Sequence, residues 1–313
     1  MSPPGRPKGE YRSAQHEGTP VNAGGIPVGL IGVGLVGIEL ARHLVRRGFR
    51  VRGFDIDPSR LALLEAAGGE VAASVAEVGA TAPRIVLALL DTDVTRRVVE
   101  GENGLMSAPT PPRYLVDTST GDPEAVVALG ARVAARGTRY VDATLSGSSA
   151  QIAARDAVVM VGGEPADCEA CADLIAAFGE RVFRLGGPGA GMKAKLASNV
   201  ILGLNRVVLA EGLAFARALG LDVEAFLATA RASPAYSVAM DVKGARMVTG
   251  RYTDPDSRVR QHLKDVEIIL RYAHAAQQPL PLSEVHHALL AAAVAAGDGD
   301  LDNAAILRRY APT

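Results

Sequence analysis

The chain has 313 residues, of which 48% are hydrophobic and 21% charged, a composition typical of a folded protein with one large or two ordinary domains. A formal net charge of −1 excludes a general electrostatic attraction to nucleic acid or to an anionic membrane. The apolar runs are too short to span a bilayer, and the first residues lack the apolar core of a signal peptide, so we expect a cytoplasmic protein.

Residues 1–25 contain Pro, Gly, Ser and charge without periodicity, which predicts a flexible tail. From Ile26 the run VGLIGVG predicts a strand, LVGIELARHLVRRG a helix and VRGFDID a second strand, which together make a βαβ unit. Further strands are predicted at 84–90, 113–119, 139–144, 157–163 and 181–186. Strands that alternate with helices indicate a parallel sheet covered on both faces, so residues 26–190 are predicted to form a Rossmann-type α/β domain.

The only two cysteines, Cys168 and Cys171, form a C-x-x-C pair in a segment with a helical pattern. A structural zinc site needs four ligands, and no second pair or histidine cluster is near in the sequence. A redox motif would follow a strand, which is also missing here, so we interpret both as small residues on an ordinary helix and predict no metal site.

Residues 191–313 show only Ala- and Leu-rich helical patterns, which predicts an all-α second domain. The helix expected from Gly191 to Leu219 is apolar around most of its circumference. Such a helix is buried on several sides, within its own domain or against another subunit. We therefore expect a homodimer or homotetramer assembled through this half.

A glycine-rich motif, G-x-G-x-x-G, extends from Gly32 to Gly37 between the first predicted strand and helix, and Asp55 ends the next strand. This context is typical of a dinucleotide-binding fingerprint: Gly32 makes the turn, Gly34 admits the pyrophosphate and Gly37 packs the helix on the strand. The alternative is a tight turn without a ligand. The predicted cofactor contacts in this motif are Gly32, Gly34, Leu35, Val36 and Gly37.

Asp55 favours NAD as the cofactor, because a carboxylate there accepts the ribose hydroxyls and repels a 2′-phosphate. Arg52 and Arg60 are near in the sequence and could bind that phosphate. NADP therefore stays open as the alternative.

The segment GPGAGMKAKLASN opens the long second-half helix. Lys195 and Asn199 are four residues apart and so share one helix face, whereas Lys193 points elsewhere. A lysine beside a positively charged nicotinamide should have its pKa lowered toward neutrality, as a general acid/base requires. A solvated lysine on a first helical turn is the alternative.

Five segments together resemble the β-hydroxyacid dehydrogenase family, which includes 3-hydroxyisobutyrate dehydrogenase and 2-hydroxy-3-oxopropionate reductase. They are VGLIGVGLVGIELARHLVRRG, VDTSTGDPE, VDATLSGSSAQIAARDAVVMVGG, GPGAGMKAKLASN and HLKDVEIIL, in the family's order and spacing. The resemblance extends from residue 26 to about 310. It implies a nicotinamide-dependent enzyme that acts on a small β-hydroxyacid.

For the substrate, the resemblance implies that Lys195 is the general acid/base and that Asn199 holds the hydroxyl. It also implies that Ser146, Gly147 and Ser148 bind the substrate carboxylate. An ordinary turn is the alternative for these last three residues.

For the cofactor, the resemblance implies contacts from Leu89, Leu90 and Thr120, and from Lys264, which would close over the cofactor from the helical domain. Asp265 beside it is assigned to substrate binding. Thr120 could instead be a helix N-cap, and Lys264 with Asp265 a solvated helix face.

The chain departs from the family pattern in the pocket segments. Thr144 and Leu145 replace the usual proline and valine, Ser148 replaces a glycine, Ser198 replaces an asparagine and Leu90 replaces a proline. The lysine and asparagine are retained, so the reaction type follows from the resemblance while the substrate does not.

Three other functions fit this sequence less well. An imine reductase that uses NADPH would carry Asp or Tyr in place of Lys195. A non-catalytic nucleotide-binding member of the family would have lost Lys195 or Asn199. A 6-phosphogluconate dehydrogenase would have a much longer helical domain.

Overall fold

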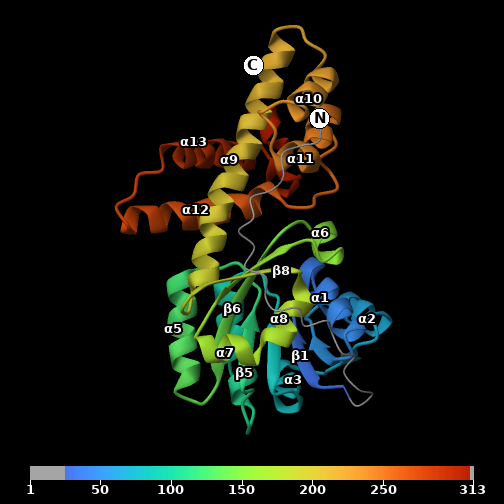
Figure 1. Cartoon of the computed structure of the whole chain (residues 1–313), viewed down its shortest axis with the longest axis vertical. Helices are drawn as coiled ribbons and strands as arrows, with labels where there is room; N and C mark the ends of the chain where they lie inside the picture. The colour runs from blue at the N-terminus through green and yellow to red at the C-terminus, as the bar shows by residue number, and fades with distance from the viewer. Residues whose placement is uncertain (1–24, 311–313) are drawn as a thin grey trace. The chain divides into compact units, whose positions relative to one another are not determined.

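In the computed structural model, which describes residues 25–310, the chain divides into two compact units between Lys195 and Leu196 (Figure 1). The division falls inside a helix, five residues beyond the predicted boundary at 190. Apart from Gly25, the predicted N-terminal tail lies outside the described residues.

The first unit consists of strands joined by short helices. Its elements are β1 (Pro27–Ile31), α1 (Leu35–Arg46), β2 (Arg50–Phe54), α2 (Pro58–Ala66), β3 (Glu70–Val71), α3 (Val75–Thr81), β4 (Arg84–Leu87), α4 (Thr92–Glu100), η1 (Leu105–Ser107), β5 (Tyr114–Asp117), α5 (Pro123–Ala134), β6 (Arg139–Ser146), α6 (Ser149–Ala153), β7 (Val158–Gly162), α7 (Pro165–Ala170), α8 (Ala172–Phe178) and β8 (Arg181–Gly186).

The eight strands form one sheet in the order β3-β2-β1-β4-β5-β6-β7-β8. The expectation of a wholly parallel sheet is wrong at one step, because β7 pairs antiparallel to β6, and β8 then runs parallel to β7. A parallel return needs a crossover of about a dozen residues or more. The connection here runs only from 147 to 157 and contains a five-residue helix, α6, so the chain turns back instead.

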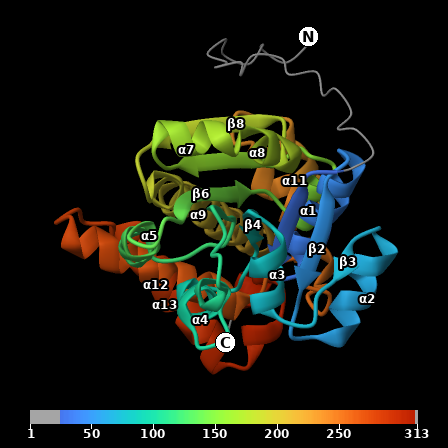
Figure 2. The same ribbon diagram turned by 90° about the horizontal axis from the view of Figure 1, so that it is seen from below.

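Helices cover both faces of the sheet, as predicted (Figure 2). Successive residues of the inner strands pack into hydrophobic cores on opposite faces of the sheet, since side chains alternate along a strand. Leu30, Val86 and Val116 belong to one core, which also contains residues of α1 and α8. Their strand neighbours Ile31 and Leu115 belong to the other, with residues of α3 and α5. The inner strands are therefore buried on both sides, which explains their continuous apolar sequences.

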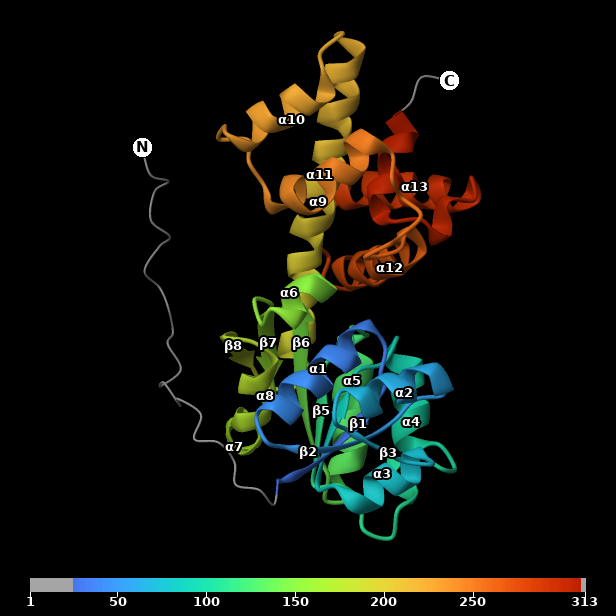
Figure 3. The ribbon, with the colours of Figure 1, turned by 90° about the vertical axis from the view of Figure 1, so that its right-hand side faces the viewer.

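The second unit is helical, as predicted (Figure 3). It contains most of α9 (Ala190–Ala218), then α10 (Val223–Arg231), α11 (Val238–Thr249), α12 (Val259–Ala275), α13 (Pro281–Ala295), η2 (Asp298–Asp300) and η3 (Asn303–Tyr310). Within residues 196–310 no strand forms, and the only β-type pairing is an isolated bridge between Arg258 and Asp302. A buried ion pair of 2.7 Å between Lys243 and Asp302 ties α11 to the start of η3.

The long helix α9 is partly exposed along its length. Ile201, Val208 and Phe215 follow one another at intervals of seven residues, and each is between 64% and 69% exposed. This interval places them on one face of the helix. Within residues 25–310, α9 is also the one helix long and apolar enough to cross a bilayer, which the short apolar runs of the sequence did not indicate.

Candidate functional site

The structure of the turn between β1 and α1 explains each glycine of the fingerprint motif in a different way. Gly32 has a φ of +92°, and a Cβ there would lie 2.3 Å from the Ala88 carbonyl oxygen. A Cβ on Gly37 would lie 2.0 Å from the carbonyl oxygen of Gly32. Gly34 differs, because its φ is −66° and a Cβ would meet nothing within 4 Å. Within residues 25–310, nothing in the packing requires glycine at position 34, whereas a ligand lying against the backbone would.

The start of α1 is suited to an anion. No side chain caps this helix, and its first turn contains no acidic residue. The first amide N–H groups of a helix have no partner within the helix, and the helix dipole adds positive charge at this end. Together with the open side of Gly34, this arrangement fits the pyrophosphate of a dinucleotide.

Asp55 connects the ends of β1 and β2. Its carboxylate accepts the Val33 N–H at 2.6 Å and the Asp57 N–H at 2.9 Å. Each carboxylate oxygen can accept a further hydrogen bond, so ribose hydroxyls can still be bound. Ile56, the next residue, is 91% exposed.

The two arginines near Asp55 have carboxylate partners of their own. Arg52 forms an ion pair with Glu77 of α3, and both side chains are about one third exposed. Arg60 lies 3.9 Å from Asp57, one turn earlier in the sequence. Arg52 is thus engaged toward α3, while Arg60 has only a long surface contact, and such contacts contribute little.

The loops after β4 and β5 are joined by a buried network that the sequence analysis missed. The Leu89 N–H donates to Ser119 Oγ at 2.9 Å, and the Ser119 N–H donates to Asp117 Oδ1 at 2.9 Å. Tyr140 donates its hydroxyl to the other oxygen of Asp117. Burial raises the pKa of Asp117 to about 6, and hydrogen bonds from Ser119 and Tyr140 offset part of that rise. The polar residues at the end of the strand YLVD were the available signal.

Of the remaining residues predicted to contact the cofactor, Leu90 is 64% exposed and Thr120 is half-buried. The N-cap alternative for Thr120 is wrong, because Asp122 caps α5 by accepting the N–H groups of Glu124 and Ala125.

Ser146, Gly147 and Ser148 follow one another at the end of β6. Ser146 is half-buried and Gly147 is exposed. Ser148 is the N-cap of α6 in a capping box: its Oγ accepts the Gln151 N–H at 3.3 Å, and its own N–H donates to Gln151 Oε1 at 2.9 Å. The pattern S-x-x-Q was visible in the sequence and would have predicted this box.

Lys195 and Asn199 both lie on α9, one turn apart. Lys195 is half-buried and Asn199 is 8% exposed, whereas Lys193 is exposed. On α12, the Lys264 and Asp265 side chains are 32% and 15% exposed and lie 3.9 Å apart. Asp265 in particular is too buried for the alternative of a solvated helix face.

The two cysteines are buried. Cys168 is 3% exposed and Cys171 is fully buried, and α7 and α8 meet at Cys171 instead of forming one helix. Burial raises the pKa of the Cys171 thiol to about 12, which keeps it protonated and unreactive. Within residues 25–310 no three His, Cys, Asp or Glu side chains group closely enough to hold a metal ion.

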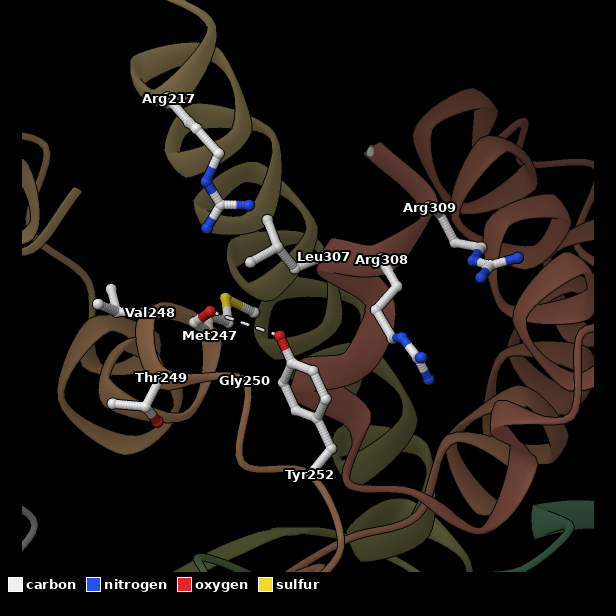
Figure 4. A pocket seen from close by; sticks show the side chains of 9 residues that line it. All are labelled: Arg217, Met247, Val248, Thr249, Gly250, Tyr252, Leu307, Arg308 and Arg309. Atoms are coloured by element: carbon white, nitrogen blue, oxygen red, sulfur yellow. Dashed lines mark hydrogen bonds between the residues drawn. The ribbon is translucent and has the colours of Figure 1, made fainter. Parts of the chain in front are cut away.

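A hollow in the second unit contains none of the predicted site residues (Figure 4). Tyr252 donates its hydroxyl to the Met247 carbonyl at 3.4 Å at its edge, and Arg308 and Arg309 are both paired with Asp298. The fingerprint turn, in the first unit, is the better candidate for cofactor binding.

Two family models match the chain in succession. The NAD binding domain of 6-phosphogluconate dehydrogenase matches residues 27–187, and the NAD-binding domain of NADP-dependent 3-hydroxyisobutyrate dehydrogenase matches residues 189–310. The chain belongs to the β-hydroxyacid dehydrogenase family. Its fingerprint turn is accordingly the turn of a nicotinamide-dinucleotide-binding domain.

Similar proteins of known activity support this family membership. The chain is 32% identical to L-threonate dehydrogenase of Cupriavidus necator, over 90% of this chain and 95% of that protein. It is 30% identical to 2-hydroxy-3-oxopropionate reductase of Escherichia coli, over 90% and 96%. The structure of 3-hydroxyisobutyrate dehydrogenase from Salmonella typhimurium, 26% identical, superposes with a TM-score of 0.84 over 90% of this chain and 99% of that one.

Proposed function

We propose that this β-hydroxyacid dehydrogenase uses NAD to oxidise a small β-hydroxyacid, or NADH to reduce the corresponding semialdehyde, with Lys195 as the general acid/base. The observation that supports this most is the pair of Lys195 and Asn199 on α9. Lys195 is half-buried and Asn199 is buried, one turn apart, on the helix that directly follows the dinucleotide-binding domain.

In oxidation, neutral Lys195 would take the proton of the substrate hydroxyl while the carbon beneath it loses hydride. The nicotinamide of bound NAD supplies the hydride acceptor. In reduction, protonated Lys195 returns the proton to the carbonyl oxygen. Asn199, with an amide NH2 group that donates and a carbonyl oxygen that accepts, can hold that oxygen in either state.

Ser146 and Gly147 are our candidates for holding the substrate carboxylate. A hydroxyl and a backbone N–H at the end of a strand are suitable donors to a carboxylate. The N–H and the hydroxyl oxygen of Ser148 are both hydrogen-bonded to Gln151, so we assign Ser148 a smaller contribution to carboxylate binding.

The preference for NAD is supported by Asp55 and its surroundings. The carboxylate is fixed by two backbone N–H groups at the end of β2. Arg52, the first arginine that could have bound a 2′-phosphate, is paired with Glu77. A 2′-phosphate would therefore meet a carboxylate with one loosely held arginine, Arg60, nearby.

The test is a substrate panel assayed with NAD⁺ and NADP⁺. L-Threonate is the first candidate because of the 32% identity to its dehydrogenase, followed by 3-hydroxyisobutyrate, 2-(hydroxymethyl)glutarate and, in the reductive direction, 2-hydroxy-3-oxopropionate. Turnover of one of them with NAD(H) supports the proposal. Reduction of cyclic imines with NADPH alone would identify an imine reductase, and tight NAD binding without turnover of any panel member would identify a non-catalytic protein.

We also propose that the protein self-associates through the exposed face of α9. Ile201, Val208 and Phe215 would be covered by a second copy, since large apolar side chains gathered on one face mark an interface. A bilayer is the less suitable partner, because the helix also carries Glu211 and Arg217 near its end.

Light scattering of wild type and Val208→Glu tests this assembly. The variant should shift toward the monomer. Leu282→Glu, at an equally exposed apolar position on α13, is the matched control and should keep the wild-type mass. A monomeric wild-type protein at micromolar concentration would contradict the proposal.

A further inference from the structure

The helix that carries Lys195 has no local N-cap. The segment before it, residues 186–189, contains no Ser, Thr, Asp or Asn whose side chain could accept the first N–H groups. Other helices of the chain use such a residue immediately before their first turn: Asp57, Ser74, Asp91, Asp122, Ser148 and Asp222. The cap of α9 must come from elsewhere, because unpaired N–H groups at a buried helix end are costly.

Asp142, near the middle of β6, supplies it. Its Oδ1 accepts the Gly189 N–H at 2.8 Å and its Oδ2 accepts the Met192 N–H at 2.9 Å. The Gly191 N–H is a third donor to this carboxylate. Thr144, two residues further on the same face of β6, donates its hydroxyl to the Gly191 carbonyl at 3.1 Å. Two side chains of β6 thus bind both the backbone N–H donors and a carbonyl acceptor of this turn.

The contact between the sheet and the first turn of α9 leaves no space for a side chain. A Cβ on Gly162 of β7 would lie 2.6 Å from the Ala190 nitrogen. A Cβ on Gly191 would lie 2.4 Å from the Met160 carbonyl oxygen. Backbone meets backbone on both sides, so the turn is fixed in position as well as capped.

Asp142 also carries charge into this contact. It is 1% exposed, and burial raises the pKa of its carboxyl, while hydrogen bonds from Gly189 and Met192 act in the opposite direction. Lys195 is three residues beyond Met192, which is about 4.5 Å along the helix axis. An ionised carboxylate at this helix end would favour the positive charge of a lysine placed one turn away.

We propose that Asp142 is a positioning residue for Lys195: it fixes the height and rotation of the first turn of α9, and its charge favours the protonated form of the lysine. This proposal rests on the proposed role of Lys195. It assigns Asp142 no contact with substrate or cofactor.

The experiment compares Asp142→Asn with Asp222→Asn. Asp222 caps α10 through two N–H groups at 2.8 Å and 2.9 Å, so its loss removes similar bonds from a helix that carries no predicted catalytic residue. We expect Asp142→Asn to lower kcat at least about tenfold, because small misplacements of a catalytic group are costly. The NAD dissociation constant should stay within about twofold of wild type, and the acid limb of the kcat pH profile should move to lower pH.

A second measurement does not depend on turnover. Amide hydrogen exchange over residues 187–195, in the full-length chain without cofactor, should become faster in Asp142→Asn and stay unchanged in Asp222→Asn. If Asp142→Asn keeps the wild-type kcat and pH profile and only loses thermal stability, as Asp222→Asn should, the residue is merely structural and the proposal is overturned.

Two further variants distinguish a failure to fold and a failure of the proposed function from a failure of the positioning role. If Asp142→Asn does not fold, Thr144→Val removes the weaker bond to the same turn and should lower kcat several-fold with NAD binding retained. A wild-type kcat in Thr144→Val would then overturn the proposal. If Lys195→Ala remains active, the proposed function itself is wrong, whereas an inactive Lys195→Ala beside a fully active Asp142→Asn rejects only the positioning role.

Discussion

Asp117 and Asp142 occupy paired positions on the neighbouring strands β5 and β6, and both are buried. Asp117 holds Ser119, and through it Leu89, in the loops beside the fingerprint turn. Asp142 holds the first turn of the lysine-bearing helix. Two adjacent buried carboxylates therefore hold two different segments: Asp117 the loops beside the fingerprint turn, and Asp142 the first turn of α9.

The buried Asp117 should make stability depend on pH. Its pKa is about 6 in the folded protein against 3.8 for an ordinary aspartate, so between these values the folded state binds more protons and gains stability as pH falls. Relative to Asp117→Asn, the wild type should gain up to about 3 kcal/mol of unfolding free energy between pH 7 and pH 4. Urea denaturation at several pH values measures this, and a constant difference between the two proteins would exclude the effect.

The buried His286 should have the opposite dependence. Burial, with Arg206 and His287 nearby, lowers its pKa from 6.5 to about 4, and the His262 ring lies 5.0 Å away. The unfolded chain therefore binds the extra proton, and the wild type should lose up to about 3 kcal/mol between pH 6.5 and pH 4. His286→Gln should lose less over this range. The control His274→Gln, at a side chain 72% exposed, should follow the wild type.

Lys195→Ala should reduce kcat by about 10²- to 10⁴-fold while NAD binding, measured by calorimetry, is unchanged, because the lysine acts on the substrate proton. Lys195→Arg should not restore activity, since a guanidinium does not give up its proton near neutral pH. Lys193→Ala, at an exposed position two residues earlier, is the control and should behave as wild type. A loss of less than tenfold in Lys195→Ala would remove the residue from this role.

NAD should be preferred over NADP by at least about tenfold in kcat/KM, which corresponds to about 1.4 kcal/mol. Asp55→Asn should narrow the preference by removing the repulsion of a 2′-phosphate while keeping some hydrogen bonding. Arg60→Ala should change neither cofactor's kcat/KM by more than about twofold. A selective loss of NADP use in Arg60→Ala would show that this arginine, and not Asp55, governs the choice.

The parts of this structure that the sequence predicted are those encoded by neighbouring residues. The fingerprint turn, the change from strands to helices after residue 190 and the i, i+4 placement of Lys195 and Asn199 all follow from local spacing. The reversal of β7 was not foreseen, because the alternation of strand and helix patterns is the same for either strand direction.

Contacts between distant residues were also missed. Asp142 reaches partners 47 and 50 residues along the chain, and Arg52 pairs with Glu77 across 25 residues. Neither pairing leaves a periodic signal in one sequence. A structural role for Asp117 could have been predicted, since a charged residue that ends an apolar strand usually forms a specific hydrogen bond or ion pair. Its partner Tyr140 belongs to the next strand, however, and the pairing becomes visible only in the fold.

The capping of α9 from a remote strand has a consequence for the order of folding. The Ala- and Leu-rich body of this helix has high intrinsic propensity, whereas its start, Gly187–Gly191, contains three glycines and a proline and has very little. That start gains its hydrogen bonds only after β6 has found its place in the sheet, because the partners are separated by almost fifty residues. The first turn of α9 should therefore be among the last segments to become ordered. A fragment that begins at residue 187 should form the body of the helix while its first turn stays frayed.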